Sequence, residues 1–150
     1  MLYNTQNNPK WGQLRLGTSN CTMAGYGCTT TAIANSVNKM PWEILQTTKY
    51  TQAGAIIWES VGTDVWKFKA RYRQYDRARI KQAANNSNIL VILEVINRKS
   101  PTGRHWVTLE SLGFGGYNCV DPYNPNDKWS ALRNFYNIYQ ILGHAEFIKS

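Results

Sequence analysis

The chain has 150 residues, of which 43% are hydrophobic, 17% are charged and 13% are aromatic. This length is typical of one domain, and the composition excludes a disordered protein and a coiled coil. The 17 Lys and Arg residues outnumber the 9 Asp and Glu residues, so the net charge is +8. Such an excess favours an anionic partner, whether a cell-wall polymer, a nucleic acid or a membrane surface.

The chain shows no internal repeat and no linker-like segment, and we expect a single domain over 1–150. The longest apolar run, over 89–95, is interrupted by Glu94 and is far shorter than the ~20 residues of a spanning helix. No membrane span is therefore expected. The first residues contain no signal peptide, which predicts a protein made in a cytoplasm, or an excised domain.

Helices are predicted in the first half of the chain. Residues 1–27 are rich in Asn, Gly and Thr, which indicates an irregular arm. Apolar side chains then recur at helical spacing from Cys28, and Pro41 is expected to end that helix and open a second one. A third short helix over 55–61 completes the expected helical part, 28–66.

Residues 67–150 are predicted to form mainly an antiparallel sheet, so the fold class is α+β. Three patterns indicate strands: alternation of cations with less polar residues, a continuous apolar run, and two segments that flank the turn GFGG. These strands cover 67–73, 89–96, 105–112 and 117–120. One helix is expected after Asp76, a suitable N-cap. A loop over 121–129 and one or two short strands or helical turns over 134–148 follow.

The basic residues are partly concentrated, because seven of the seventeen lie between Lys67 and Lys81. The simplest interpretation is the solvated face of an edge strand, where cations discourage strand pairing. The alternative is a binding surface for an anionic wall polymer, with Tyr72 and Tyr75 stacking on sugars or bases. No nucleic-acid-binding motif accompanies the segment, so nucleic acid is the less favoured partner.

Cys28 is the candidate nucleophile. It directly precedes a predicted helix, whose N-terminal N–H groups and dipole favour the thiolate form. Tyr26, Gly27 and Trp106 are the candidate substrate-binding residues. Small residues beside Cys28 allow a substrate backbone to approach, and Trp106, next to His105, would form a wall of the substrate cleft. The alternative is a buried structural cysteine at a helix start.

The candidate general base is His105, and the only other histidine is His144. Asp121 follows His105 by sixteen residues across the Gly-rich turn. A turn with an odd residue count, or a bulge, would set His105 opposite Tyr123 with Asp121 on the same sheet face, whereas an even turn would separate them. In the first register Asp121 fixes the imidazole tautomer, as in a nucleophile–base–carboxylate triad.

The two remaining cysteines have simpler interpretations. Cys119 is predicted to be a packed core thiol, and Cys21 lies in a loop. A disulfide between them is the less favoured alternative. The sequence has no CxxC or HxxxH pair, so no metal site is expected, and the proposed chemistry requires no cofactor.

Four motifs suggest a family. They are Gln-x-x-Pro-x-Trp from Gln6 to Trp11, GYGC ending at Cys28, GRHWV around His105, and the Asp-Pro pair at Asp121. With these motifs, residues 6–125 resemble the bacteriocin-processing (double-glycine) peptidase-like group of papain-like cysteine peptidases, which is frequent in bacteria and their phages.

The resemblance implies a papain-like fold, with an N-terminal catalytic helix packed on an antiparallel sheet. It also implies that Cys28 is the nucleophile, His105 the general base and Asp121 the residue that orients the imidazole. Gln6 would donate to the oxyanion from its side-chain amide, with Gln13 as the second candidate, because an oxyanion hole requires a preorganised donor.

We therefore expect a cysteine peptidase or amidase that forms a thioester intermediate. The positive charge and the abundance of the group in phages favour peptidoglycan crosslinks as substrate. The protein would be made in a bacterial cytoplasm and act from a virion or after release. Two alternatives remain: a peptidase that processes a leader or virion protein, and an inactive module that binds wall polymer or nucleic acid.

Overall fold

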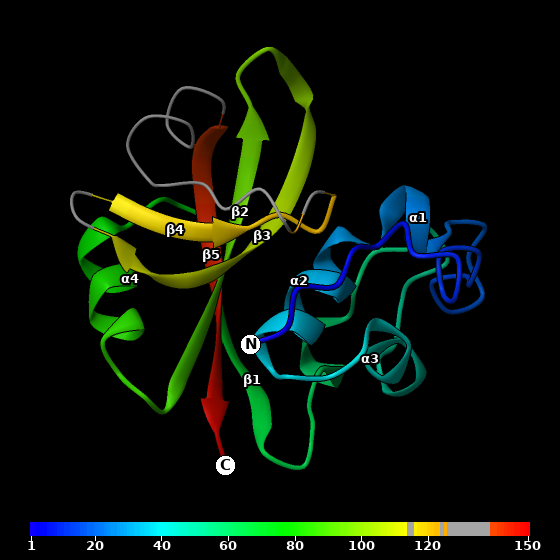
Figure 1. Cartoon of the computed structure of the whole chain (residues 1–150), viewed down its shortest axis with the longest axis horizontal. Helices are drawn as coiled ribbons and strands as arrows, with labels where there is room; N and C mark the ends of the chain where they lie inside the picture. Colours follow the sequence, from blue (N-terminus) through cyan, green and yellow to red (C-terminus); the bar gives the residue numbers. More distant parts are fainter. Residues whose placement is uncertain (114–115, 124, 126–138) are drawn as a thin grey trace.

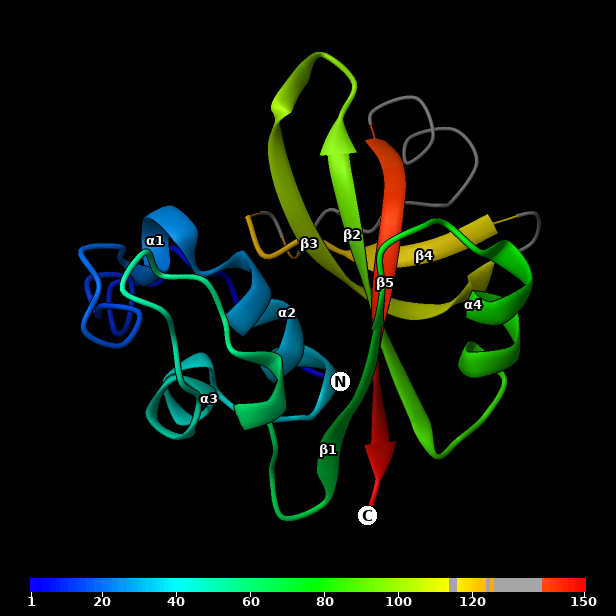
Figure 2. The same ribbon diagram turned by 180° about the vertical axis from the view of Figure 1, so that it is seen from behind.

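The computed structural model describes residues 1–113, 116–123, 125 and 139–150. The described residues form an α+β fold, a five-stranded antiparallel sheet with helices on both faces (Figure 1, and from behind in Figure 2). The helices are α1 (Met23–Tyr26), α2 (Cys28–Ser36), α3 (Pro41–Thr47) and α4 (Arg77–Ala84), with a 3-10 turn η1 (Trp58–Ser60). The strands are β1 (Trp66–Tyr72), β2 (Ile89–Asn97), β3 (Ser100–Gly113), β4 (Gly116–Val120) and β5 (Tyr139–Lys149). The strand order is β1-β5-β2-β3-β4.

Helix α2 begins where it was predicted and ends earlier. A Cβ atom on its N-cap, Gly27, would lie 2.5 Å from the carbonyl oxygen of Met23, so glycine is required for α2 to follow α1 directly. The helix stops at Ser36 and does not reach Pro41. The reason is Asn38, whose φ of 59° is left-handed and cannot continue an α-helix.

The next two elements are shorter than α2. Helix α3 begins at Pro41 as predicted, and the Glu43 carboxylate accepts the Met40 backbone N–H at 2.7 Å, which satisfies one donor at the helix start. The third helix, predicted over 55–61, is a single 3-10 turn, η1.

The sheet is built around β2 and β5. Strand β2 is buried over most of its length, as its apolar sequence predicted. Strand β5 pairs with both β2 and β1 and so lies inside the sheet, although only short strands or turns were predicted there. Its polar residues His144 and Glu146 are buried, which hides the strand from a pattern of apolar alternation. The loop predicted over 121–129 lies largely outside the described residues.

The predicted β3–β4 hairpin is confirmed, and a bulge sets its register. Leu112 pairs with Tyr117, whereas Thr108 pairs with Val120, because the register shifts between Leu109 and Ser111. One extra residue on β3 changes which side chains share a face. The bulge therefore gives the arrangement in which residues 105 and 121 lie on the same side of the sheet.

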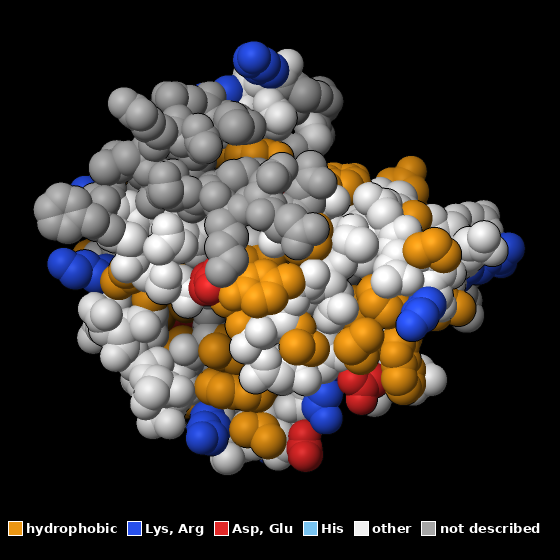
Figure 3. Space-filling view, in the orientation of Figure 1, with side chains coloured by type: hydrophobic (Ala, Val, Ile, Leu, Met, Phe, Trp, Pro, Cys, Tyr) orange, Lys and Arg blue, Asp and Glu red, His pale blue; other side chains and the backbone are white. Residues whose placement is uncertain are grey.

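The prediction of one solvated basic face on β1 is wrong. Strand β1 is an edge strand, as predicted, but its register shifts between Phe68 and Ala70. Beyond this bulge Arg71 turns inward, and its Nη2 donates to Glu94 at 2.9 Å. On the face drawn in Figure 3, Lys and Arg side chains are scattered and do not form one patch.

Each face of the sheet has its own core. Ile80 of α4 packs with Val91, Leu93 and other side chains on one face, and Ile33 of α2 packs with Ile92 and others on the opposite face. Figures 1 and 2 show α4 on the side away from α1, α2 and α3. None of the helices in the described residues is long and apolar enough to cross a bilayer.

The cysteines are all unpaired. Cys119 is fully buried in the α4-side core, as predicted. Cys21 is half-buried, and its thiol donates to the Ala53 carbonyl at 3.4 Å. The alternative of a disulfide between Cys21 and Cys119 is therefore wrong.

Candidate active site

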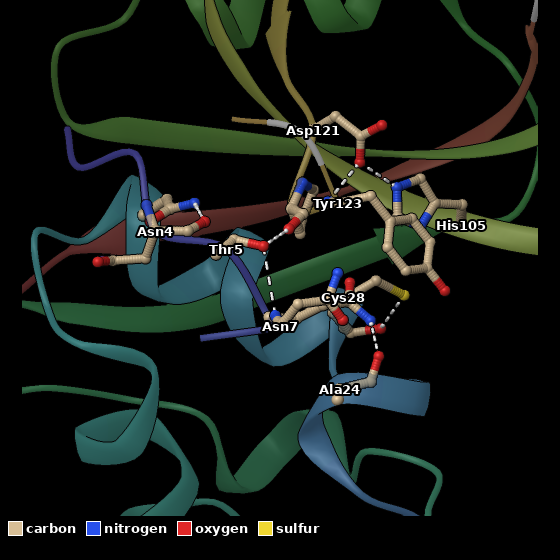
Figure 4. A network of polar contacts seen from close by, with 12 residues as sticks. Asn4, Thr5, Asn7, Ala24, Cys28, His105, Asp121 and Tyr123 are labelled. Atoms are coloured by element: carbon tan, nitrogen blue, oxygen red, sulfur yellow. Dashed lines mark hydrogen bonds and ion pairs between the residues drawn. The ribbon is translucent and has the colours of Figure 1, made fainter. Parts of the chain in front are cut away.

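A surface groove with a volume of about 410 Å³ contains the candidate nucleophile and base. Cys28 at the start of α2 and His105 in β3 both line it, together with Tyr26, Trp106 and Tyr123 among others. Figure 4 shows Cys28 on the α2 side and the His105 ring on the β3 side, with the Asp121 carboxylate next to the ring. Elements far apart in the sequence thus meet at one groove.

The Cys28 thiol is half-buried. Burial opposes its ionisation, but hydrogen bonding to His105 and the charge of that ring, assisted by the Trp106 backbone and the Thr29 hydroxyl, lower its pKa below the ordinary value. Its place at the first residue of α2 adds N-terminal N–H groups that have no acceptor within the helix. The site therefore favours a thiolate.

The His105 ring is fixed by Asp121. Its Nε2 lies 2.6 Å from the Asp121 Oδ1, and both side chains are buried. Burial opposes a charged ring, but the hydrogen bond to Asp121 and the hydrogen bond and charge of Cys28 raise the pKa of His105 to about 9. Because Asp121 occupies Nε2, the Nδ1 atom is the nitrogen available to Cys28. The arrangement therefore favours a thiolate–imidazolium pair at neutral pH.

Tyr123 and Tyr139 complete the surroundings of the ring. Tyr123 stacks on His105 with the ring centroids 5.0 Å apart, and Tyr139 lies at 6.3 Å. The Tyr123 backbone N–H also donates to Asp121 at 2.9 Å. Neither tyrosine was among the predicted site residues. The hairpin register that sets Tyr123 opposite His105 could have identified Tyr123 from the sequence. Tyr139 lies on β5, and no sequence signal connected it with His105.

Gln6 is fully buried and held at two points. Its backbone N–H donates to the Pro122 carbonyl at 3.0 Å, and its side-chain Nε2 donates to the Ala24 carbonyl at 2.9 Å. The carbonyl of Ala24 can only accept, so the amide nitrogen must face it. Gln13, the second candidate, is exposed. Gln6 is thereby fixed between the residues that precede α2 and the residues that follow β4.

The Gln6 amide also reaches Tyr123. Burial and the charges of Cys28 and Asp121 raise the pKa of the Tyr123 hydroxyl, and a hydrogen bond from Gln6 opposes this increase. Gln6 is not among the described residues that line the groove, but its amide is next to Tyr123, which does line it.

The three predicted substrate-binding residues differ in placement. Tyr26 is 65% exposed and lines the groove, and Trp106 lines it from a nearly buried position, 5.0 Å from the Trp58 ring. Gly27 is buried against Met23 and is not part of the groove lining. Gly27 contributes through helix packing, which positions Cys28.

The alternative base, His144, is distant from this chemistry. It is fully buried in β5, where its Nε2 lies 3.0 Å from the Glu146 Oε1. Among the residues that the structure describes, no group of three or more His, Cys, Asp or Glu side chains could hold a metal ion.

Comparison of the chain with protein-family models, curated proteins and solved structures gives no match. We therefore infer the chemistry of this site from its own residues. A polarised thiol, an imidazole with a bound carboxylate and a buried amide donor are the groups that a thiol acyl transfer requires.

Proposed function

We propose that the chain is a cysteine peptidase or amidase with a papain-like fold. The observation that supports it most is the linked set Cys28, His105 and Asp121, in which the carboxylate holds Nε2 of the ring and the ring lowers the pKa of the thiol. A buried structural cysteine would have no such partner. Cys119 is the contrasting example in this chain, because burial and, to a smaller extent, the charge of Asp121 raise the pKa of its thiol.

The first half-reaction forms a thioester. The Cys28 thiolate attacks the carbonyl carbon of the scissile amide and makes an S–C bond, and the carbonyl oxygen becomes an oxyanion. As the tetrahedral intermediate collapses, the C–N bond breaks and the His105 imidazolium gives its proton to the leaving amine. The amine departs neutral and the acyl group remains on sulfur.

The oxyanion has two candidate donors. The backbone N–H of Cys28 lies in the first turn of α2, where no acceptor exists within the helix. The Gln6 side-chain amide is preorganised by its bond to the Ala24 carbonyl, and the Gln6 backbone by its bond to the Pro122 carbonyl. Donors that are already oriented stabilise the developing charge without reorganisation, an effect of ~10²–10³ in rate for one donor.

The second half-reaction restores the enzyme. The neutral His105 ring takes a proton from water, and the hydroxide attacks the thioester carbonyl. The C–S bond then breaks, which releases the carboxylic acid, and the sulfur leaves as the thiolate beside the imidazolium. Asp121 keeps the same ring orientation in both halves.

Peptide bridges of peptidoglycan are the proposed substrate. The groove is open and presents exposed aromatic side chains, Tyr26 and Tyr123, which suit a flexible peptide chain. The net charge of +8 favours association with an anionic wall. A peptidase that processes a leader or virion protein would use the same chemistry, and the experiment below separates the two substrates.

The experiment compares the protein with Cys28→Ala and, as a matched control, Cys21→Ala. We expect iodoacetamide at pH 6 to label Cys28 selectively, as measured by mass spectrometry, because the site favours its thiolate. We also expect purified cell walls to release new amino groups with the protein and with Cys21→Ala, and not with Cys28→Ala.

Two other outcomes have defined meanings. Selective labelling without wall cleavage would support the nucleophile and favour a processing peptidase. Labelling of Cys28 no faster than that of a free cysteine peptide, with walls bound but intact, would contradict the peptidase and support a binding module.

A further inference from the structure

The groove contains one side chain whose charge the proposed reaction does not use. Arg104 lines the groove directly before His105, and its side chain is 64% exposed. Among the described residues that line the groove, Arg104 is the only Lys, Arg, Asp or Glu. The residue with this exposed guanidinium therefore lines the same groove as the reacting groups.

This guanidinium is only loosely neutralised. Its Nη1 lies 3.6 Å from the Glu94 Oε1, which is beyond hydrogen-bond distance. The other oxygen of Glu94 accepts from Arg71 at 2.9 Å. One buried carboxylate is thus shared by two guanidinium groups, and the three side chains together carry one excess positive charge.

Arg71 cannot take the place of Arg104 in the groove. Its guanidinium carbon lies 5.5 Å from the Trp58 ring centroid and 5.4 Å from the Trp106 ring centroid, and its side chain is 20% exposed. Cation–π contacts and the bond to Glu94 hold it in the interior. The excess positive charge is therefore presented by Arg104, the more exposed of the two.

We propose that Arg104 forms a carboxylate subsite, so that the preferred substrate carries a carboxylate close to the scissile amide. A guanidinium presents planar N–H donors that match a carboxylate in a bidentate manner. The carboxylate belongs either to an acidic side chain or to a free α-carboxyl group of the peptide. This inference rests on the proposed function, because it assigns a substrate to the same groove.

The subsite is tested with small alkylating reagents that react with Cys28. N-bromoacetylglycine carries an α-carboxylate, N-bromoacetylglutamic acid α-amide carries a side-chain carboxylate, and N-bromoacetylglutamine amide is neutral. The rate for each acid is divided by the rate for the neutral reagent, at pH 6 and pH 8. The ratio reports anion binding near Cys28 whatever the absolute reactivity of the thiol.

We expect Arg104→Gln to lower the ratio for at least one acid about fivefold, the size of a good exposed ion pair. Arg104→Lys should keep part of the preference, and added salt should reduce it. Lys149→Gln, which removes one positive charge at the exposed end of β5, is the control and should leave the ratio unchanged. The acid that responds identifies the source of the carboxylate.

The two proposals fail in different ways. Equal ratios in the unchanged protein and in Arg104→Gln, with fast reaction of the neutral reagent at pH 6, would overturn the subsite and leave the nucleophile supported. Slow reaction of all reagents at pH 6 would contradict the nucleophile, and the ratio at pH 8 would still test Arg104.

Discussion

The chain contains two histidine–carboxylate pairs, and they have opposite properties. In the groove, His105 lies 2.6 Å from Asp121, and its pKa is raised to about 9 by Asp121 and Cys28 against the effect of burial. In the α4-side interior, His144 lies 3.0 Å from Glu146, and burial, assisted by the charge of Arg79, lowers its pKa. The same pairing therefore gives a charged ring in one place and a neutral ring in the other.

The neighbouring charges explain the difference. Asp121 has no cation other than His105 among its described ion-pair partners, so its charge acts on the ring. Glu146 also receives Lys69 at 2.7 Å and Arg79 at 3.3 Å. Burial opposes ionisation of Glu146, but these cations and His144 lower its pKa. At His144 burial and the charge of Arg79 therefore outweigh the hydrogen bond and the charge of Glu146, which act to raise the pKa.

The two environments also differ in access. His105 lines an open groove with a thiol beside it, whereas His144 is fully buried under the stacked ring of Tyr72, at 4.6 Å between centroids. Of the two rings, only His105 can exchange a proton with a substrate. A histidine–carboxylate pair is thus a candidate for catalysis when its carboxylate has no other cation and its ring reaches a nucleophile.

The strongest test of this contrast replaces each ring in turn. We expect His105→Gln to lower the rate of wall hydrolysis at least about 10³-fold, because it removes both the proton donor and the cation that stabilises the thiolate. His144→Gln should change the rate per folded molecule by less than about threefold. Hydrolysis assays, corrected for the folded fraction by circular dichroism, measure both, and equal losses would refute the contrast.

A smaller effect is expected from Asp121→Asn. The amide keeps a hydrogen-bond acceptor but removes the negative charge, so the pKa of His105 should fall and the alkaline limb of the pH–rate profile, near 9, should move to lower pH. We expect a roughly tenfold lower rate, less than the ~10⁴-fold loss in a Ser-His-Asp triad, because the Cys28 thiolate still holds the imidazolium. An unshifted alkaline limb would show that Asp121 does not tune the ring.

Glu146→Gln should affect stability and leave the chemistry intact. Removing the buried partner of Lys69, Arg79 and His144 should lower the free energy of unfolding by about 3 kcal/mol, the low end for a buried ion pair, since both cations reach solvent. The pKa of Glu146 is lowered in the folded state, so its stabilisation is present above the ordinary carboxyl pKa and is lost as the pH falls.

Urea unfolding between pH 3 and pH 7 measures this effect. The unchanged protein should lose stability toward acid more steeply than Glu146→Gln, and iodoacetamide labelling of Cys28 should be the same in both. A variant with altered labelling would show that the two pairs are coupled.

Local chemistry made much of the fold predictable from the sequence. The start of α2 follows from the helical spacing of apolar residues after Cys28, and that of α3 from Pro41. The N-cap of α4 follows from Asp76, whose side chain accepts the Arg79 N–H, and the buried β2 from its apolar run. These signals act within a few residues of the chain, so they appear in the sequence itself. The candidates Cys28, His105 and Asp121 were found in the same way, from residue type and neighbouring motifs, whereas Gln6 was named from the resemblance to a peptidase family.

Only the tertiary structure decided how these elements fit together. The bulges in β1 and β3, the placement of β5 inside the sheet, and the inward turn of Arg71 depend on partners that are distant in the chain. A bulge shifts every later side chain to the other face, and a buried ion pair makes a polar strand suitable for the interior. Neither effect leaves a local pattern. For this reason the sequence determined which residues are available for the chemistry, and long-range packing determined that His105 meets Cys28 while His144 does not.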